Sequence, residues 1–203
     1  MLIFKQKTKP LYFVHIPRTG GRYLRELFLK NDYIINHWNF NEYHNNIVVP
    51  HLQYPYYSKF TNHGKIKQFT IVRNPVDRFV SMFCAGIIKD KLVLNKNKIL
   101  NNKRLLFEFI ENNINNVNSH TNWFLPQHHF LNNNCKIWKI ENGLGKKFYK
   151  WMKENFKIKF KSKTIVNNYK TDYDFNKKIK LGKKTIGYIK EFYKHDYKLL
   201  GYK

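Results

Sequence analysis

The stretch FVHIPRTGGRYL, residues 13–24, contains the pattern that decides the fold. It continues a mostly apolar run, residues 11–16, whose aromatic and β-branched side chains predict a buried strand. Pro17 ends that run, and Gly20 and Gly21 permit a tight turn. Apolar residues then recur at helical spacing. A strand, a glycine turn and a helix N-terminus in this order present backbone N–H groups to an anion such as phosphate.

The turn is basic, but it matches neither of the common nucleotide-binding loops. Arg18 offers a planar guanidinium group that can form two hydrogen bonds to phosphate-type oxygens. The spacing lacks the Gly-Lys pair that the ATP and GTP loops place four residues after their first glycine, and it is not GxGxxG. From this segment alone, a turn that binds an anion and a turn that binds nothing are both open.

A second strand-to-helix junction, TIVRNPVDRFVSMF, occupies residues 70–83. Residues 68–73 predict a strand, and Asn74 is a suitable cap for a helix with proline at its first position. Arg73 therefore ends the strand, and Ser81 lies about two turns along the helix. Because carboxyl ends of parallel strands meet at one edge of a sheet, the two junctions predict a crevice for a nucleotide with several anionic groups. A salt bridge between Arg73 and Asp77, in the first turn of that helix, is the alternative.

The rest of the chain alternates between strand-like and helix-like segments. Helices are expected at 20–30, 103–114, 145–156 and 183–200, a third strand at 135–141, and irregular structure at 31–63, 95–102 and 161–182. This alternation predicts an α/β fold with a central parallel sheet flanked by helices. No internal repeat or linker divides the sequence, so one domain covering residues 1–203 is expected.

The composition suits a folded domain with a strongly basic character. The 203 residues are 42% hydrophobic and carry a formal net charge of +25, so the chain can bury a core. The charge fits a polyanionic partner such as nucleic acid, an anionic membrane, an acidic glycan or a phosphorylated cofactor. It equally fits AT-rich coding, which enriches Lys, Asn and Ile. The charge alone therefore decides no function.

Cysteine usage and the N-terminal sequence predict a cytoplasmic protein. Cys84 and Cys135 lie far apart and are expected to be buried and reduced. The first ten residues lack the apolar core of a signal peptide, and no stretch approaches the roughly 20 apolar residues of a membrane span. His128 and His129 are adjacent but lack cysteine or carboxylate partners at metal-binding spacing, so no metal site is expected.

Together, the two junctions resemble the PAPS-dependent sulfotransferases, where PAPS is 3′-phosphoadenosine 5′-phosphosulfate. FVHIPRTGGRYL resembles their 5′-phosphosulfate motif, and TIVRNPVDRFVSMF resembles their 3′-phosphate motif. The similarity is to the carbohydrate branch with HIPKTGGT-type loops, which includes heparan sulfate 2-O-sulfotransferase and bacterial enzymes. Shorter similarities follow in the same order: PHLQY at 50–54, NWFLPQHHFL at 122–131, KIWKIENG at 136–143 and FYKHDYKLLGY at 192–202.

This resemblance implies a three-layer fold like that of P-loop kinases, and in-line sulfuryl transfer from PAPS to a carbohydrate hydroxyl without a metal. It also implies which residues bind the nucleotide. The 5′-phosphosulfate is expected to contact Arg18, Thr19, Gly20, Gly21, Arg22 and Tyr23. The 3′-phosphate is expected to contact Arg73 and Ser81, and Lys170 lies in a loop that could close over the nucleotide.

The glycine turn departs from the family pattern at two places. The family usually has Lys where this chain has Arg18, and Thr-Ser where it has Arg22-Tyr23. Arginine keeps the positive charge but replaces a compact group by a planar fork. We expect binding and chemistry to be retained, and a catalytically weak protein that still binds PAPS or PAP, the desulfated product, is the alternative.

Sulfuryl transfer also requires groups that handle the acceptor and the leaving phosphate. Arg18 is expected to stabilise charge on the leaving phosphate. By resemblance to the histidine-using branch, His51 is the best general base, and Glu42 is the second choice. Either the acceptor side is lined by Asn122, Trp123, Gln127 and His128, or these residues belong to ordinary loop packing.

Two other functions compete with this one. A nucleic-acid-binding protein would fit the charge and the 14 tyrosines, but the lysines are spread over the whole chain rather than along one face. Another P-loop-like phosphotransferase would need a GK[ST] ending, which the turn lacks. A carbohydrate acceptor is therefore expected as the partner, and nucleic acid is not.

Overall fold

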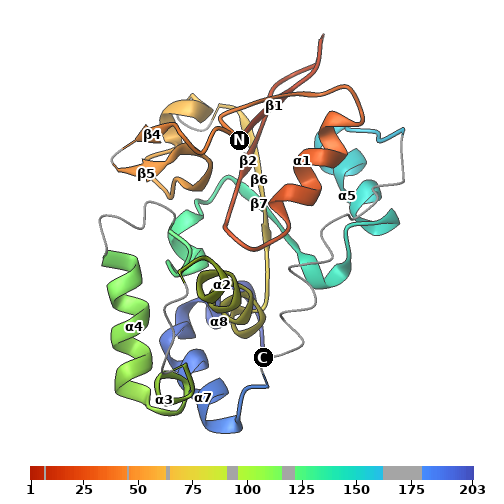
Figure 1. Cartoon of the computed structure of the whole chain (residues 1–203). Coiled ribbons are helices and arrows are strands. Elements are labelled where there is room, and N and C mark those ends of the chain that lie inside the picture. The colour runs from red at the N-terminus through yellow and green to blue at the C-terminus, as the bar shows by residue number, and fades with distance from the viewer. Residues whose placement is uncertain (7, 45, 63–64, 91–95, 116–121, 162–179) are drawn as a thin grey trace. The chain divides into compact units, whose positions relative to one another are not determined.

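The computed structural model describes residues 1–6, 8–44, 46–62, 65–90, 96–115, 122–161 and 180–203 (Figure 1). Contacts divide the chain into a first unit, residues 1–73 and 129–166, and a second unit, residues 74–128 and 167–203. Each unit draws on two separate stretches of sequence. A single domain over residues 1–203 stays a prediction.

The first unit contains the sheet and two long helices. Its strands are β1 (Leu2–Phe4), β2 (Leu11–Val14), β3 (Ile34–Asn36), β4 (Tyr43–His44), β5 (Ile47–Val48), β6 (Lys67–Val72) and β7 (Cys135–Lys139). Its helices are α1 (Gly21–Leu29) and α5 (Lys146–Phe156), with 3₁₀ turns η1 (Val49–His51), η2 (Ser58–Thr61) and η4 (Ile140–Asn142). The three predicted strands and both predicted helices of this unit are therefore present, with ends shifted by two residues or fewer.

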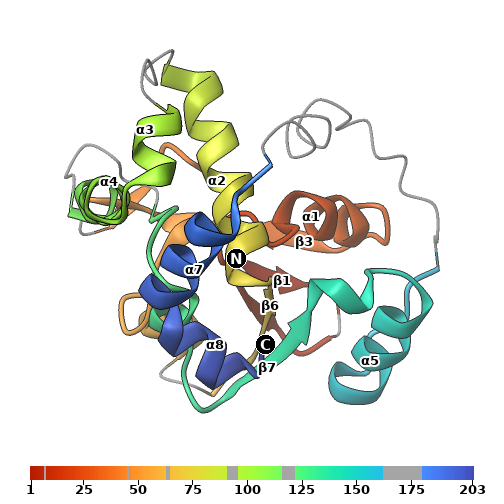
Figure 2. The same ribbon diagram turned by 90° about the horizontal axis from the view of Figure 1, so that it is seen from below.

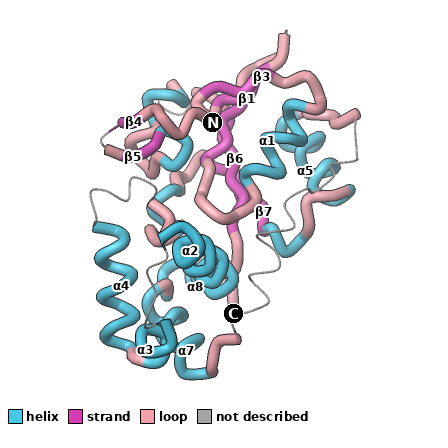
Figure 3. The backbone as a smooth tube through the Cα atoms, in the orientation of Figure 1, coloured by secondary structure: helices cyan, strands magenta, loops and turns pink. Residues whose placement is uncertain are grey.

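The central sheet, whose strands are magenta in Figure 3, is mixed rather than wholly parallel. Its strand order is β3-β1-β2-β6-β7, and β2, β6 and β7 are parallel to one another, as predicted. β1 and β3 add two antiparallel strands that the sequence did not predict. Only six residues join β1 to β2, and a parallel connection needs a dozen or more, so this pair must be antiparallel. The α/β fold class is confirmed, with this correction to its sheet.

One face of the sheet is covered by α1 and α5, which both lie to the right of the strands in Figures 1 and 2. Leu24, Leu27 and Phe28 of α1 share a core with Phe148 and Met152 of α5, and strand residues complete it. The opposite face of β2 meets the segment around η2. This arrangement holds α1, and hence the glycine turn before it, against the sheet.

The opposite face is fixed by a buried polar network. The rings of Tyr12 and Tyr57 stack with centroids 5.5 Å apart. The Tyr57 hydroxyl donates to the Phe130 carbonyl at 2.9 Å. The Asn132 amide donates to both the Tyr57 hydroxyl and Gln68 Oε1, at 3.0 and 2.9 Å. These bonds tie the segment before β7 to β6, since Gln68 is a β6 residue.

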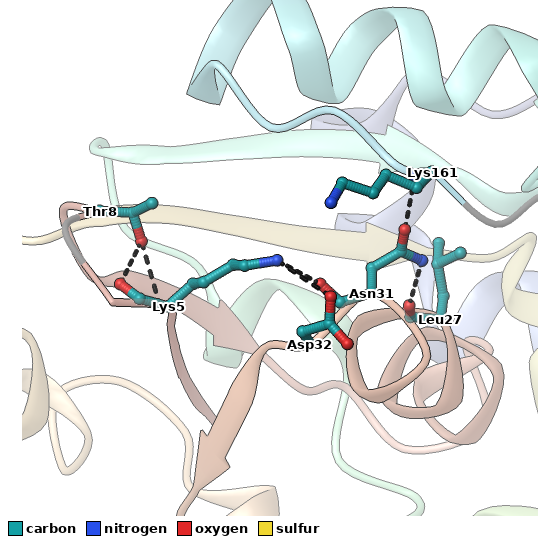
Figure 4. Close-up of polar contacts among 6 residues, drawn as sticks. All are labelled: Lys5, Thr8, Leu27, Asn31, Asp32 and Lys161. Atoms are coloured by element: carbon teal, nitrogen blue, oxygen red, sulfur yellow. Dashed lines mark hydrogen bonds and ion pairs between the residues drawn. The ribbon is translucent and has the colours of Figure 1, made fainter.

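The C-terminal end of α1 is anchored by hydrogen bonds (Figure 4). The Asn31 amide donates to the Leu27 carbonyl at 2.8 Å and accepts from the Lys161 backbone N–H at 2.6 Å. Lys5 Nζ donates to the Asn31 carbonyl at 3.0 Å and to Asp32 Oδ2 at 3.3 Å. Because a helix is stiff over nine residues, anchoring this end also fixes the direction of its N-terminus.

The second unit is helical. It contains α2 (Pro75–Asp90), α3 (Lys96–Asn101), α4 (Lys103–Asn115), α7 (Lys183–Phe192) and α8 (Lys194–Leu200), and η3 (Gln127–Phe130) begins in it. Asn74 caps α2 as predicted, because its Oδ1 accepts from the Val76 N–H at 3.0 Å. The predicted loop at 95–102 instead contains α3, and the predicted closing helix is interrupted at Tyr193. Tyr193 is buried, and its hydroxyl donates to the Phe124 carbonyl at 2.9 Å.

Buried charged side chains hold residues 122–128 in the second unit. The Arg78 guanidinium, 1% exposed, donates to the carbonyls of Leu125 at 3.0 Å and Trp123 at 2.8 Å. The fully buried Asp196 carboxylate accepts from the backbone N–H groups of Gln127 and His128, at 2.8 and 2.9 Å. Its Oδ1 also lies 2.7 Å from His128 Nδ1. These bonds give the segment a defined packing role.

Candidate active site at the carboxyl edge of the sheet

Three parallel strands of the first unit end at one edge of the sheet. In the register of the ladders, Val14 pairs with Thr70, and Val72 pairs with Lys139. The glycine turn, residues 17–21, follows the first of these strands, and Arg73 follows the second. Arg73 Nη1 donates to the Arg18 carbonyl oxygen at 3.5 Å. The sheet therefore brings together the two basic junctions that lie 55 residues apart in sequence, at the edge where open α/β sheets bind ligands.

The backbone of the turn is left-handed at two residues. Arg18 has φ of 67° and Gly20 has φ of 95°. Left-handed residues alternating with right-handed ones turn successive N–H groups towards a common centre, which is how backbone concavities bind anions. The Thr19 hydroxyl donates to the Ile16 carbonyl at 2.7 Å and its side chain is fully buried. The Thr19 side chain thus stabilises the turn, and the contact that Thr19 can make with a ligand is through its backbone.

Both glycines are required by close neighbours. A Cβ atom on Gly20 would lie 3.1 Å from Ile140 Cδ1, in addition to the strain of its positive φ. A Cβ atom on Gly21 would lie 2.1 Å from His15 Nε2, which is a direct collision. The two positions therefore let α1 begin directly against the end of β2, with its first N–H groups at the sheet edge.

The N-terminus of α1 has an electrostatic preference for anions. Its cap is Gly20, which provides no side-chain hydrogen bond, and its first turn contains no acidic residue. The exposed Arg22 adds a positive charge in that turn. The N–H groups of a first helical turn have no intrahelical acceptors, and the helix dipole is positive here. An oxygen of a phosphate or phosphosulfate would accept hydrogen bonds from these N–H groups, and its negative charge would be stabilised by the dipole.

The Tyr23 side chain faces the other way, towards α5. Its hydroxyl donates to the Leu144 carbonyl at 3.2 Å and lies 3.3 Å from the Tyr149 hydroxyl. Burial, together with the hydrogen bond to Tyr149, raises the pKa of Tyr23. The structure gives this residue a packing role, and its expected contact with the nucleotide stays a prediction.

Behind the turn lies a cluster of aromatic and imidazole rings. His15 is buried, and its ring stacks on Trp38 with centroids 4.7 Å apart. The centroid of the His51 ring lies 4.9 Å from that of the His15 ring. The Phe40 ring makes a T-shaped contact with the His51 ring, with centroids 5.2 Å apart. His15, which directly follows β2, is therefore held in place by ring packing. Burial, followed by the neighbouring His51, lowers the pKa of His15 well below its usual value.

The lowered pKa of His15 predicts a pH-dependent stability. The unfolded chain binds a proton on His15 near pH 6.5, whereas the folded protein resists it, so stability is retained above that pH and lost below it. The free energy of unfolding should fall by up to about 1.4 kcal/mol for each pH unit well below 6.5. Urea unfolding from pH 8 to pH 5 measures this. In His15→Asn, this part of the slope should vanish, and equal slopes for both proteins would contradict the assignment.

The two candidate bases lie in different surroundings. His51 is only 4% exposed, in η1, and belongs to the ring cluster beside the turn. Glu42 is exposed and lines an open groove of about 630 Å³ in the first unit. Among the described residues, the groove is lined by Arg25, Asn36, His37, Trp38, Asn39 and Glu42, with aliphatic side chains of α1 and β3. His51 is not one of the residues that line this groove.

Two of the predicted nucleotide contacts lie outside the first unit. Ser81 is buried on α2 in the second unit, and Lys170 lies outside the described residues. Their contacts with the nucleotide stay predictions. Gln127 is fully buried, and His128 bonds to Asp196, so the second-unit segment around them is explained by packing.

Sequence reasoning missed Trp38, which joins the groove to the ring cluster. The stretch NHWNFNEYH, residues 36–44, was expected to be irregular, and it forms the groove wall together with α1 and β3. The sequence feature that could have pointed to this groove is a run of asparagines and aromatic residues without helical or strand periodicity. Such a composition is typical of surfaces that bind polar ligands with flat apolar faces.

Two kinds of feature are absent from the described part of the chain. No three or more His, Cys, Asp or Glu side chains are grouped where they could hold a metal ion. None of the described helices is long and apolar enough to cross a membrane.

Comparison with known proteins identifies the family of the chain. A family model described as the sulfotransferase family matches residues 2–203. No curated protein and no solved structure matches the chain. The match covers nearly the whole chain, including the glycine turn, Arg73 and both candidate bases. The chain therefore belongs to the sulfotransferase family and is a PAPS-dependent transferase.

Proposed function

We propose that this protein transfers a sulfuryl group from PAPS to a hydroxyl group of a carbohydrate. The observation that carries the proposal is the meeting of the glycine turn with Arg73, where Arg73 Nη1 lies 3.5 Å from the Arg18 carbonyl. Separate cationic and N–H-donating groups at one sheet edge suit a ligand with more than one anionic group. PAPS has such groups, and it supplies the sulfuryl group of the reaction.

The residues of the first unit fit the two ends of that nucleotide. The left-handed turn and the first N–H groups of α1, from Gly20 and Gly21 onward, hold the 5′-phosphosulfate. Arg18 and Arg22 add positive charge there, and Thr19 keeps the turn in shape through its bond to Ile16. By resemblance to the family, Arg73 binds the 3′-phosphate, and Ser81 is the second residue expected to do so.

In this proposal, the carbohydrate hydroxyl loses its proton to His51 while its oxygen bonds to sulfur. The bond from sulfur to the 5′-phosphate oxygen breaks, and the products are the sulfate ester and PAP. His51 lies 4.9 Å from the His15 ring, and that ring lies directly against Gly21, so the base is close to the turn. A base that meets one hydroxyl needs little exposed surface. Glu42, in the groove, is the alternative base.

PAP binding tests the proposal directly. At about 100 times its dissociation constant, PAP should stabilise the protein by about 2.7 kcal/mol, because it binds only the folded state. Adenosine 5′-monophosphate, which lacks the 3′-phosphate, should bind more weakly. In Arg73→Ala, PAP should lose this advantage, because the cation that distinguishes the two nucleotides is gone. Titration calorimetry with both nucleotides measures the difference.

The controls separate this function from its competitors. Arg104→Ala removes an exposed arginine of α4 that pairs with Glu108 at 2.7 Å, and it should leave PAP affinity unchanged. Single-stranded DNA should bind no better to the free protein than to the PAP-saturated protein. Stabilisation by DNA and not by PAP would instead support a nucleic-acid-binding protein. PAP binding without sulfuryl transfer from PAPS to any glycan would support the catalytically weak alternative.

A further inference from the structure

We propose that the groove beside the ring cluster is the acceptor site, and that its occupant is an uncharged saccharide. This inference rests on the proposed function, since it names the acceptor of that reaction. The groove is formed wholly within the first unit and encloses about 630 Å³. That volume is within the range of sites that bind small molecules or a few sugar rings.

The charges of the groove lining do not favour a polyanion as its occupant. Its lining contains one arginine and one glutamate, Arg25 and Glu42, whose formal charges cancel. Arg25 Nη1 is already engaged by Glu26 Oε1 at 2.6 Å. Burial lowers the pKa of His37, the remaining titratable group of the lining, so its ring is uncharged near neutral pH. The lining of the groove thus has no net formal charge, although the chain as a whole has a formal net charge of +25.

The uncharged groups of the lining match the surface of a sugar ring. A pyranose has flat faces of C–H groups and a rim of hydroxyl groups. The Trp38 indole is half-buried at the groove and offers a flat apolar face. The Asn36 and Asn39 side chains are exposed there and can donate to and accept from hydroxyl groups. An uncharged saccharide therefore meets both parts of this lining.

The groove is connected to the glycine turn by one side chain. Trp38 lines the groove on one side and stacks on His15 on the other, with ring centroids 4.7 Å apart. The His15 ring in turn lies against Gly21, the first residue of α1. A saccharide stacked on Trp38 is thus held close to the N–H groups that we assign to the 5′-phosphosulfate. This proximity is what sulfuryl transfer requires of an acceptor site.

Acceptor kinetics with defined sugars test the inference. The probes are three neutral tetrasaccharides, chitotetraose, maltotetraose and mannotetraose, and two carboxylated ones, unsulfated heparosan and chondroitin tetrasaccharides. Transfer of radiolabelled sulfate from PAPS should occur to at least one neutral sugar, with a KM that salt hardly changes. Trp38→Ala should raise that KM about tenfold, while PAP affinity is unchanged.

Matched variants guard against a folding defect. Tyr43→Ala removes an aromatic ring of β4 that is 54% exposed and does not line the groove, and it should leave the KM unchanged. Asn39→Ala, at an exposed position of the lining, should raise the sugar KM several-fold even if Trp38→Ala does not fold. Trp38→Phe keeps a ring beside His15 and should restore most of the lost affinity.

The outcomes separate the two proposals. If PAP does not bind, the proposed function itself is wrong. If PAP binds but every neutral sugar fails as an acceptor, the inference is overturned and the proposed function stands. Strong salt dependence with only carboxylated sugars as acceptors would also overturn it, as would an unchanged KM in both Trp38→Ala and Asn39→Ala.

Discussion

Replacing His51 with alanine should lower the single-turnover rate of sulfuryl transfer by about 10²- to 10⁴-fold, the usual contribution of a general base. His51 belongs to the ring cluster that touches the glycine turn through His15, and its loss removes the group that we assign as proton acceptor for the carbohydrate hydroxyl. PAP affinity should stay nearly unchanged, because the base contacts the acceptor hydroxyl. Rapid-quench measurement with excess enzyme isolates this chemical step from product release.

The matched variant for this experiment is Glu42→Gln, which removes the second candidate base without changing its size. Glu42 lines the groove and is exposed, so its loss should raise the acceptor KM modestly and leave the chemical step near the native rate. Because His51 is 4% exposed, its replacement leaves a cavity, and thermal unfolding must show that the variant is folded. Native transfer by His51→Ala and none by Glu42→Gln would assign the base to the carboxylate.

Replacing Arg18 with alanine should lower kcat by about 10²- to 10³-fold, with a smaller effect on PAP affinity. Negative charge grows on the leaving 5′-phosphate as its bond to sulfur breaks, so a cation at the turn stabilises the transition state more than the ground state. Arg18 has φ of 67°, and alanine is strained there to a similar degree. The comparison therefore reports the side chain rather than the backbone. Steady-state kinetics with PAPS and the neutral tetrasaccharides measure it.

Arg18→Lys is the informative companion, because lysine is the usual family residue at this position. It retains the charge while exchanging the planar fork for a compact group, so its kcat should be native or higher. Arg22→Ala serves as the control on the neighbouring first turn of α1, where the exposed side chain should contribute mainly to affinity. Equal kcat for Arg18→Ala and the native enzyme would show that Arg18 does not contact the leaving group.

Local sequence was sufficient for the elements that position the nucleotide. The apolar run before Pro17, the two glycines and the Asn74-Pro75 pair predict where β2, α1, β6 and α2 begin or end. The structure confirms each within two residues, and Asn74 caps α2 through its hydrogen bond to Val76. Hydrophobic periodicity, turn chemistry and capping act over a few residues, so they can be read from a single chain.

Secondary-structure elements that form only by packing against residues distant in sequence could not be predicted from local patterns. β1 and β3 have three residues each and are strands only because they pair with one another and with β2. The six-residue α3 lies in an asparagine-rich stretch whose propensity favours a loop, yet Leu100 packs in the core of the second unit. In these cases tertiary packing outweighs a weak local preference.

At the site, local sequence was enough to predict the residue types at the sheet edge, namely the glycine turn, Arg18 and Arg73. The contacts among side chains follow from the folded structure: the Arg73 guanidinium reaches the Arg18 carbonyl, Tyr23 turns towards α5, and His51 packs beside His15. It also created the groove, because residues 25 and 42 come together only when α1 and β3 are both in place. The physical reason is range: a motif specifies its own backbone, whereas burial and side-chain contacts depend on segments that only folding brings together.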